Sequence, residues 1–405
     1  MIRRPPRSTQ SRSSAASDVY KRQINSISNM KKEMQKWRRH LHTIPELGFE
    51  ESKTSEFISR KLNDFGIEVH QNIAKTGVVG VLHGSEPGKI SIGLRADMDA
   101  LEMPEENIFE YKSQNNSNMH ACGHDGHMAM LLGAAKYLSE NKNFKGTVYF
   151  IFQPAEEGLG GGKVMVDEGL FEKFPMQTVW GMHNWPGLDV GKAAVHSGPV
   201  MASADGFKIT VLGKGGHAAI PQLAKDPVPV AASIISGLQT LVSRSIDPVN
   251  SAVVSVTVIK AGTASNVIPD QVSMEGTCRS MHQKDRIKLE QGIKNIAINI
   301  AKASGLEAKV DYISGYPATH NTLKEASEAS IIVEEVLGIN SVEKALPPSM
   351  ASEDFSYMLK EKPGAYIWLG AGNPGPGKML HNCLLYTSDA ADDLLCVDLG
   401  GRRII

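Results

Sequence analysis

Short apolar runs alternate with helical stretches over the first half of the chain, and this alternation constrains the fold more than any other feature. The strand-like runs lie at 78–84, 90–100, 146–153 and 178–185, and the helical stretches between them at 127–141 and 163–174. Continuously apolar strands are buried on both faces, and helices between them are typical of a mostly parallel sheet. A further helix is expected from residue 24 to 62, interrupted at Pro45. We therefore predict an α/β fold.

The pattern changes near residue 194. Strands are expected at 205–214, 252–262, 271–280 and 306–315, with helices at 227–244 and 283–305. The resulting order β-α-β-β-α-β is ferredoxin-like and forms a self-contained unit. A helix at 324–338 and a strand at 364–372 then resume the first pattern. We predict a mixed, mostly parallel sheet domain with an inserted ferredoxin-like α+β domain, because so long a chain exceeds what one core usually supports.

The two ends of the chain look like translated flanking DNA. One possible coding sequence for Met1–Thr9 has a reverse complement that, read one base in, encodes Val397–Ile404, and the same relation links Ser17–Gln23 with Cys383–Asp389. We therefore expect residues 1–23 and 383–405 to be non-native, adaptor-like tails. The predicted catalytic domain comprises residues 24–193 and 316–382, and the inserted domain residues 194–315.

Composition excludes several classes of protein once the tails are set aside. The tails carry a net +3 of the chain's −1, so the native segment has a net charge near −4. Such a mildly acidic chain offers no basic surface for nucleic acid or membrane binding. Only Cys122 and Cys278 remain outside the tails, which predicts no disulfide framework and fits a cytoplasmic protein. No apolar run reaches the length of a membrane span.

Residues that can bind metal ions gather where predicted strands end. They are Asp97 and Asp99, Cys122 and His124, Glu156 and Glu157, His183, and His381. Ligands of open α/β sheets bind at the carboxyl edge of the strands, so these side chains are expected to converge. Taken alone, Cys122 and His124 also fit a buried thiol beside a capping imidazole, and adjacent glutamates are common on surfaces. Position before a helix N-terminus is expected to favour the thiolate of Cys122.

A thiolate, imidazoles and carboxylates together suit Zn²⁺, Mn²⁺, Co²⁺ or Ni²⁺ better than Mg²⁺. A structural zinc site would need four closed ligands, usually from paired Cys-x₂-Cys units, and the chain has none. A catalytic pair of metals lowers the pKa of bound water, and a carboxylate that is not a ligand must then accept the proton. Adjacent glutamates can divide these two tasks. A cysteine amidase using Cys122 and His124, or a non-catalytic metal-binding module, remains an alternative.

Several motifs together resemble one family. They include "RRHLHTIPELGFEE", "GLRADMDALEMPE", "MHACGHDGHMAMLLGAA", "FQPAEEGLGGG", "GMHNWPG" and "AGTASNVIPD". The chain resembles the amidohydrolase branch of the aminoacylase/carboxypeptidase-G-like dinuclear metallopeptidases, which includes hippurate hydrolases, N-acetyl-diaminopimelate deacetylases and auxin-conjugate hydrolases. The resemblance implies hydrolysis of N-acyl amino acids, or dipeptidase or carboxypeptidase activity as the alternative. It also implies two divalent metal ions and a homodimer or dimer-based oligomer.

The resemblance assigns roles residue by residue. It implies five metal ligands, Cys122, His124, Glu157, His183 and His381, and makes Glu156 the general acid/base. Asp97 would orient a ligand, and the inserted domain would be a lid and dimerisation domain. From this lid His217 would stabilise the oxyanion, and Asn266 and Arg279 would hold the substrate carboxylate. The family continues beyond "LHN" where the adaptor-like tail begins here, so a catalytically impaired, metal-binding product is a further expectation.

Overall fold

The computed structural model describes residues 29–372, 375 and 379–385, so most of the two predicted tails lies outside the described residues. Pro199–His320 and Pro347–Tyr357 form one compact unit, and the remaining described residues form the other. The boundaries predicted for the inserted domain, 194–315, stay a prediction. Among the described residues, no helix is both long enough and apolar enough to cross a bilayer.

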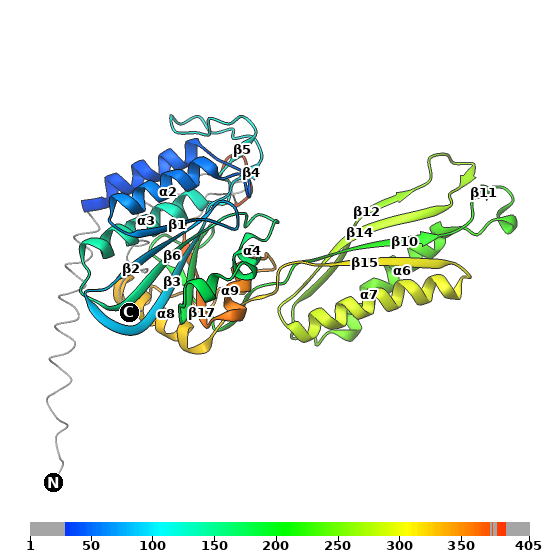
Figure 1. Cartoon of the computed structure of the whole chain (residues 1–405). Coiled ribbons are helices and arrows are strands. Elements are labelled where there is room, and N and C mark those ends of the chain that lie inside the picture. The colour runs from blue at the N-terminus through cyan, green and yellow to red at the C-terminus, as the bar shows by residue number, and fades with distance from the viewer. Residues whose placement is uncertain (1–28, 373–374, 376–378, 386–405) are drawn as a thin grey trace, which may run out of the picture. The chain divides into compact units, whose positions relative to one another are not determined.

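The first unit is built on a seven-stranded mixed sheet (Figure 1). In spatial order its strands are β1 (Glu68–Ile73), β2 (Gly77–His83), β6 (Lys145–Gln153), β3 (Glu86–Asp97), β7 (Thr178–Trp185), β17 (Gly364–Gly370) and β8 (Ala193–Ala194). The four central strands, β6, β3, β7 and β17, pair in parallel, while β1, β2 and β8 pair antiparallel. The α/β prediction is confirmed.

Helices cover this sheet because their apolar faces need burial. The helical residues 29–43 end before Pro45, and the larger helices that follow are α2 (Ser52–Asp64), α3 (His124–Glu140) and α8 (Leu323–Leu337). Figure 1 shows α2 and α3 side by side. Their buried residues share one core with alternate residues of β3, namely Ile92, Leu94 and Ala96. The side chains that alternate with these three, among them Arg95 and Asp97, lie on the other face of β3.

One expected helix is wrong in detail. The sequence predicts a single helix over 163–174, but the structure has α4 (Gly161–Asp167) and α5 (Leu170–Lys173). Gly169 separates them with a φ of 85°, a left-handed conformation that ends a helix and that glycine adopts without steric cost. The short helix α9 (Ser356–Glu361) is an addition to the predicted elements.

The second unit contains a four-stranded antiparallel sheet in the order β12 (Ala252–Ala261), β14 (Gln271–Ser280), β10 (Asp205–Leu212) and β15 (Glu307–Ser314). The helices α6 (Pro227–Thr240) and α7 (Gln283–Ala303) join these strands, and α6 continues into a π-turn, η2 (Leu241–Ser245). Buried residues of both helices share a core with Phe207, Ile209 and Val211 of β10. In chain order the unit is β-α-β-β-α-β, which confirms the ferredoxin-like prediction.

Smaller elements complete the chain. They are β4 (Leu101–Glu102), β5 (Asn118–Met119), β9 (Gly198–Met201), β11 (Gly216–His217), η1 (Pro221–Leu223), β13 (Val267–Ile268) and β16 (Thr319–Asn321). The pair β4–β5 brackets a loop that precedes α3, and β11 pairs with β13 in the second unit.

Candidate metal centre

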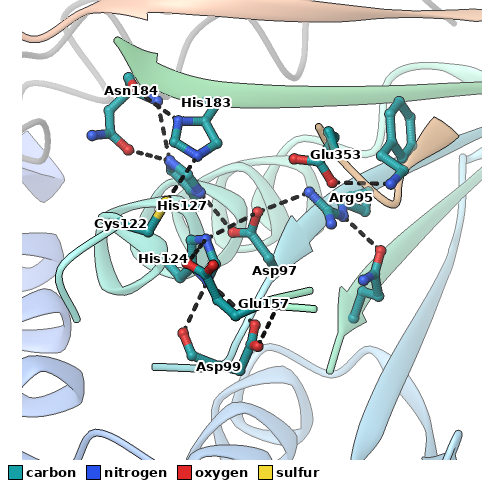
Figure 2. A network of polar contacts seen from close by, with 12 residues as sticks. Arg95, Asp97, Asp99, Cys122, His124, His127, Glu157, His183, Asn184 and Glu353 are labelled. Carbon is teal, nitrogen blue, oxygen red and sulfur yellow. Dashed lines mark hydrogen bonds and ion pairs between the residues drawn. The ribbon is translucent and has the colours of Figure 1, made fainter. Parts of the chain in front are cut away.

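Three neighbouring parallel strands deliver the first residues of the site. β3 lies between β6 and β7, so the carboxyl ends of all three strands lie at the same edge of the sheet. Asp97 ends β3, Glu156 and Glu157 follow β6, and His183 lies near the end of β7. All four side chains are largely buried. Figure 2 shows Asp97, Glu157 and His183 grouped with residues from α3. The strand ends therefore converge as the sequence predicts.

Cys122 and His124 reach the same place through a tight turn into α3. Gly123 between them is the N-cap residue of α3 and has a φ of 97°. A Cβ at this position would lie 2.4 Å from Oδ1 of Asn184, so only glycine fits this close approach. As a result Sγ of Cys122 lies 3.4 Å from Nε2 of His183, 61 residues further along the chain.

The predicted ligands form two groups that share one residue. Atoms able to bind metal in Cys122, His124 and His183 all lie within 4.8 Å of one another, and the same holds for Cys122, Glu157 and His381. Nε2 of His381 lies 3.4 Å from Oε1 of Glu157, which in turn lies 3.9 Å from Nε2 of His124. Two ion positions that share a thiolate would use all five residues.

Both buried imidazoles in the first group present the same nitrogen to the site. Nδ1 of His124 lies 2.9 Å from the carbonyl oxygen of Asp99, and Nδ1 of His183 lies 2.6 Å from the carbonyl oxygen of Asn184. Each Nδ1–H therefore donates to a backbone carbonyl, so in the neutral imidazole the Nε2 lone pair is directed into the site. This arrangement of hydrogen bonds is typical of metal-binding histidines.

Two buried atoms at the centre have no hydrogen-bond partner among the described residues: Nε2 of His124 and Oε1 of Glu157. Buried polar groups nearly always have partners, so such atoms need an explanation. Cations bound by these two atoms would supply it. The donor set, one sulfur with imidazole nitrogens and carboxylate oxygens, matches Zn²⁺, Mn²⁺, Co²⁺ or Ni²⁺ chemistry. The residues present therefore fit a pair of divalent ions.

The electrostatics of the metal-free site also favour a cation. Burial lowers the pKa of His124, but the carboxylates of Asp97, Asp99 and Glu157 outweigh it and raise that pKa to about 10. Burial, together with the charges of Glu157 and Glu156, raises the pKa of Cys122 well above its usual value. In the metal-free protein these effects outweigh the one expected from the helix N-terminus, and a ligating thiolate at Cys122 stays a prediction. The thiolate needs the cation's own charge.

Asp97 lies under this group in a buried network. Its Oδ2 accepts a hydrogen bond from Nη1 of Arg95 at 2.8 Å, and its Oδ1 lies 2.6 Å from Nδ1 of His127. Oδ2 is also 3.6 Å from Nε2 of His124. Despite its burial, the charges of His124, His127 and Arg95 hold the pKa of Asp97 well below its usual range. Asp97 contacts the predicted ligands as an ionised carboxylate.

The turn that carries the two glutamates has an unusual backbone. Ala155, which precedes Glu156, has a φ of 55°, in the left-handed region that residues with a Cβ seldom adopt. The N–H of Glu157 donates to Oδ2 of Asp99 at 2.9 Å. Ligand-competent atoms of His124, Glu156 and Glu157 lie within 4.8 Å of one another. Glu156 is therefore beside the ion positions although it is not one of the five predicted ligands.

His381 comes from the end of the described chain. Its backbone N–H donates to the carbonyl of Ala121 at 2.8 Å, which fixes the residue next to Cys122. Its side chain is about half exposed, unlike those of His124 and His183. The carboxylate of Glu157, whose Oε1 lies 3.4 Å from Nε2 of His381, raises the pKa of His381. This ligand position is thus the one closest to solvent.

Sequence reasoning gave no firm role to His127 and none to Glu51. His127 contacts Asp97, and its Nε2 lies 2.6 Å from Oδ1 of Asn184. Its spacing from His124 places both on one face of α3, with ring centroids 5.5 Å apart, and this spacing was a usable signal. Glu51 is fully buried and accepts a hydrogen bond from the N–H of Ala155. No periodicity in the sequence indicates that contact.

The three predicted substrate residues lie in the second unit. His217 and Asn266 are exposed neighbours, because β11 pairs with β13 and the N–H of Ala218 donates to the carbonyl of Asn266. Nδ1 of His217 accepts the N–H of Ala219 at 3.1 Å, so in the neutral imidazole the proton is on Nε2. Arg279 is in β14, where its Nη1 donates to Oγ of Ser352. Their roles toward the substrate stay predictions.

Comparison with known proteins gives a consistent result. The model of peptidase family M20/M25/M40 matches residues 93–391. Hippurate hydrolase of Campylobacter jejuni is 44% identical over 346 residues, which cover 85% of this chain and 90% of that protein. Thermostable carboxypeptidase 1 of Saccharolobus solfataricus is 38% identical over 368 residues, which cover 89% of this chain and 92% of the carboxypeptidase.

A solved structure extends the similarity to three dimensions. The YXEP protein of Bacillus subtilis, described as a dinuclear metal binding peptidase from the M20 family, is 34% identical to this chain. The two superpose with a TM-score of 0.80, and the match covers 92% of this chain and 98% of that chain.

Proposed function

Because the chain belongs to the amidohydrolase branch of peptidase family M20/M25/M40 and is a hydrolase of amide bonds, we propose that it cleaves N-acyl amino acids with Glu156 as general acid and base. The observation that carries the proposal is the pair of ligand groups sharing Cys122, with the carboxylate of Glu156 beside them. Hippurate is N-benzoylglycine, so the hippurate hydrolase at 44% identity supports aroyl-amino acids as substrates, and an N-acetylcysteine deacetylase of Bacillus subtilis at 41% identity supports acetyl-amino acids.

In this proposal Cys122, His124, Glu157, His183 and His381 hold two divalent ions, of Zn, Mn, Co or Ni. When bound, such ions polarise the amide carbonyl and lower the pKa of water at the site. Asp97 fixes the orientation of the imidazoles through its contacts with His127 and His124. The buried carbonyls of Asp99 and Asn184 hold each imidazole in one tautomer.

Glu156 moves the proton. Its carboxylate accepts a proton as the water oxygen attacks the carbonyl carbon, and it delivers that proton to the amide nitrogen as the C–N bond breaks. The products are a carboxylic acid and a free amino acid. Its position beside His124 and Glu157 supports this role, since it lies next to the ion positions without being one of the five predicted ligands. The lid residue His217 would donate Nε2–H to the oxyanion, from the same chain or from a second copy.

The substitution Glu156→Gln tests the assignment. It removes the proton acceptor and keeps the size and most hydrogen bonds of the side chain, so kcat should fall by about 10²–10⁴-fold. The metal content, measured by atomic emission after dialysis, should stay at the wild-type value because no ligand is lost. Activity retained by the Glu156→Gln variant, or activity lost only together with metal, would contradict the role of Glu156.

A second candidate within the family is a carboxypeptidase or dipeptidase. The carboxypeptidase at 38% identity supports it, because that relative matches nearly the same length of chain. Both activities use the same hydrolytic groups and differ in the acyl group on the carbonyl side of the scissile bond. A panel of acetyl- and benzoyl-amino acids set against free dipeptides separates them. Higher kcat/KM on free dipeptides would favour the second candidate.

A further inference from the structure

The segment before α2 contacts the turn at Ala155, which carries Glu156 and Glu157. Glu51, the residue preceding α2, is fully buried, although a carboxylate is among the groups least often buried without a partner. Its Oε1 accepts the backbone N–H of Ala155 at 2.8 Å, and its Oε2 accepts the hydroxyl of Thr76 at 2.5 Å. Glu51 and Ala155 are 104 residues apart in the chain. The motif "PELGFEE" thereby reaches the turn that carries Glu156 and Glu157.

The segment before α2 also packs closely against the turn at Ala155. A Cβ on Gly48 would lie 2.9 Å from Cβ of Ala155, so this glycine lets the segment approach the turn. Ala155 itself has a φ of 55° and is fully buried. A residue with a Cβ persists in this conformation only where its surroundings determine it. The hydrogen bond from Ala155 to Glu51 and the contact with Gly48 are those surroundings.

The turn is held at both ends by buried carboxylates. Glu51 accepts the N–H of Ala155, and Asp99 accepts the N–H of Glu157. Asp99 also lies 3.3 Å from Nδ1 of His124 through its Oδ1. Between these two anchors stands Glu156. The backbone that aims the proposed base and its neighbouring ligand is therefore fixed from two directions.

We propose that Glu51 is a positioning residue, which holds the turn at Ala155 so that Glu156 faces the substrate and Glu157 faces the metal ions. This inference rests on the proposed function for the role of Glu156, but its effect on metal binding through Glu157 does not depend on the substrate. Burial raises the pKa of Glu51 to about 7, which shows that this position disfavours a charged carboxylate. The hydrogen bonds that Glu51 accepts explain why a carboxylate nevertheless occupies it.

Three variants and one control test the proposal. Glu51→Ala removes the acceptor of the Ala155 N–H. Glu51→Asp keeps the charge but shortens the side chain by one methylene, and it serves if the alanine variant does not fold. Glu51→Gln keeps an oxygen that can accept the Ala155 N–H. Ile58→Ala removes a fully buried side chain from α2 without touching the turn, as a control for lost stability.

Mn²⁺ affinity by chelator competition, steady-state kinetics and thermal unfolding are measured on each full-length variant. Glu51→Ala and Glu51→Asp should weaken Mn²⁺ binding by about 10–100-fold, as loss of residues that orient ligands does. They should lower kcat by a similar factor with little change in KM, because a displacement of about 1 Å misaligns the base. Glu51→Gln should stay within about threefold of wild type, as the remaining hydrogen bond implies. Ile58→Ala should lose thermal stability and keep its Mn²⁺ affinity.

The proposal is overturned if Glu51→Ala or Glu51→Asp binds Mn²⁺ like wild type. It is equally overturned if Glu51→Gln loses as much Mn²⁺ affinity as Glu51→Ala. The same holds if Ile58→Ala, with a thermal stability similar to that of Glu51→Ala, loses as much Mn²⁺ affinity as Glu51→Ala. If the wild-type protein hydrolyses no acyl amino acid, the proposed function fails, and the Mn²⁺ measurements still decide the role of Glu51.

Discussion

Sγ of Cys122 lies 3.4 Å from Nε2 of His183, and the same thiol belongs to a second group with Glu157 and His381. A single cysteine thus joins two sets of metal-competent side chains. One set is buried, and the other includes a half-exposed histidine. Because the two groups share Cys122 and differ in their other members, single substitutions should affect them unequally.

Cys122→Ala should lose both ions, whereas His381→Ala should lose one. The thiolate belongs to both groups, and the His381 imidazole to one only. Atomic emission after dialysis should show that the number of Mn²⁺ ions per chain falls from two to below about one half in Cys122→Ala. Losing a residue that only orients a ligand already lowers metal affinity about 10–100-fold, and losing the ligand itself should lower it at least as much. Cys278→Ser, a buried cysteine of the second unit, should keep both ions. Equal stoichiometry in the Cys122 and His381 variants would contradict the shared thiolate.

Arg279→Lys should raise KM and leave kcat nearly unchanged. Lysine keeps the positive charge but cannot form the two parallel hydrogen bonds that a guanidinium makes with a carboxylate. The loss of one charge-assisted hydrogen bond, about 1.5–3 kcal/mol, corresponds to a rise in KM of about 10–150-fold. The matched control is the same acyl amino acid with its carboxylate converted to an amide. If the variant and wild type differ equally on both substrates, Arg279 does not bind the carboxylate.

The metal-free protein should lose stability as the pH rises from about 6.5 to about 9. Burial opposes the charge on His42, but Asp125 and Glu105 outweigh it and raise the pKa of His42 to about 9. Nδ1 and Nε2 of His42 lie 2.9 Å from Asp125 and 3.2 Å from Glu105. A histidine whose folded-state pKa exceeds its unfolded value binds more protons when folded, so its stabilisation is complete below pH 6.5 and is lost through pH 9.

This stabilisation amounts to about 3 kcal/mol, from about 1.4 kcal/mol per pKa unit. The check is urea unfolding between pH 6 and 9.5 for wild type and His42→Gln. His42→Gln should lack the part of the decline that His42 contributes and keep the part that comes from His124, whose pKa is also raised, so its decline over this window should be clearly shallower than that of wild type. Parallel curves for the two proteins would mean that His42 does not titrate in that range.

The sequence predicted the residues that follow regular strands. Asp97, Glu157 and His183 could be located because β3, β6 and β7 each contain a strand-like apolar run whose end is visible in the chain. Parallel pairing then requires those ends to share one edge. The ferredoxin-like unit could be predicted for a similar reason, since its strands alternate apolar and polar residues.

The remaining features depend on contacts between distant segments. The contact of Glu51 with Ala155 joins the entrance of α2 to a turn after β6, and nothing in either local pattern implies it. The left-handed φ of Ala155 is likewise imposed by tertiary packing. The raised pKa of Cys122 was missed because it follows from burial and nearby carboxylates, which the position before a helix does not reveal. The break at Gly169 did have a local signal, the glycine itself.

We expect hydrolysis of N-acyl amino acids to require a pair of divalent ions held around Cys122. The most direct measurement is the rate of N-benzoylglycine and N-acetyl-amino acid hydrolysis during a titration of Mn²⁺ into protein stripped by a chelator. Activity should fall below about 1% of wild type without metal and return as the second equivalent binds, since the ions would supply the activated water. Full activity in the stripped protein would rule out a metal-dependent reaction and favour a thiol mechanism at Cys122.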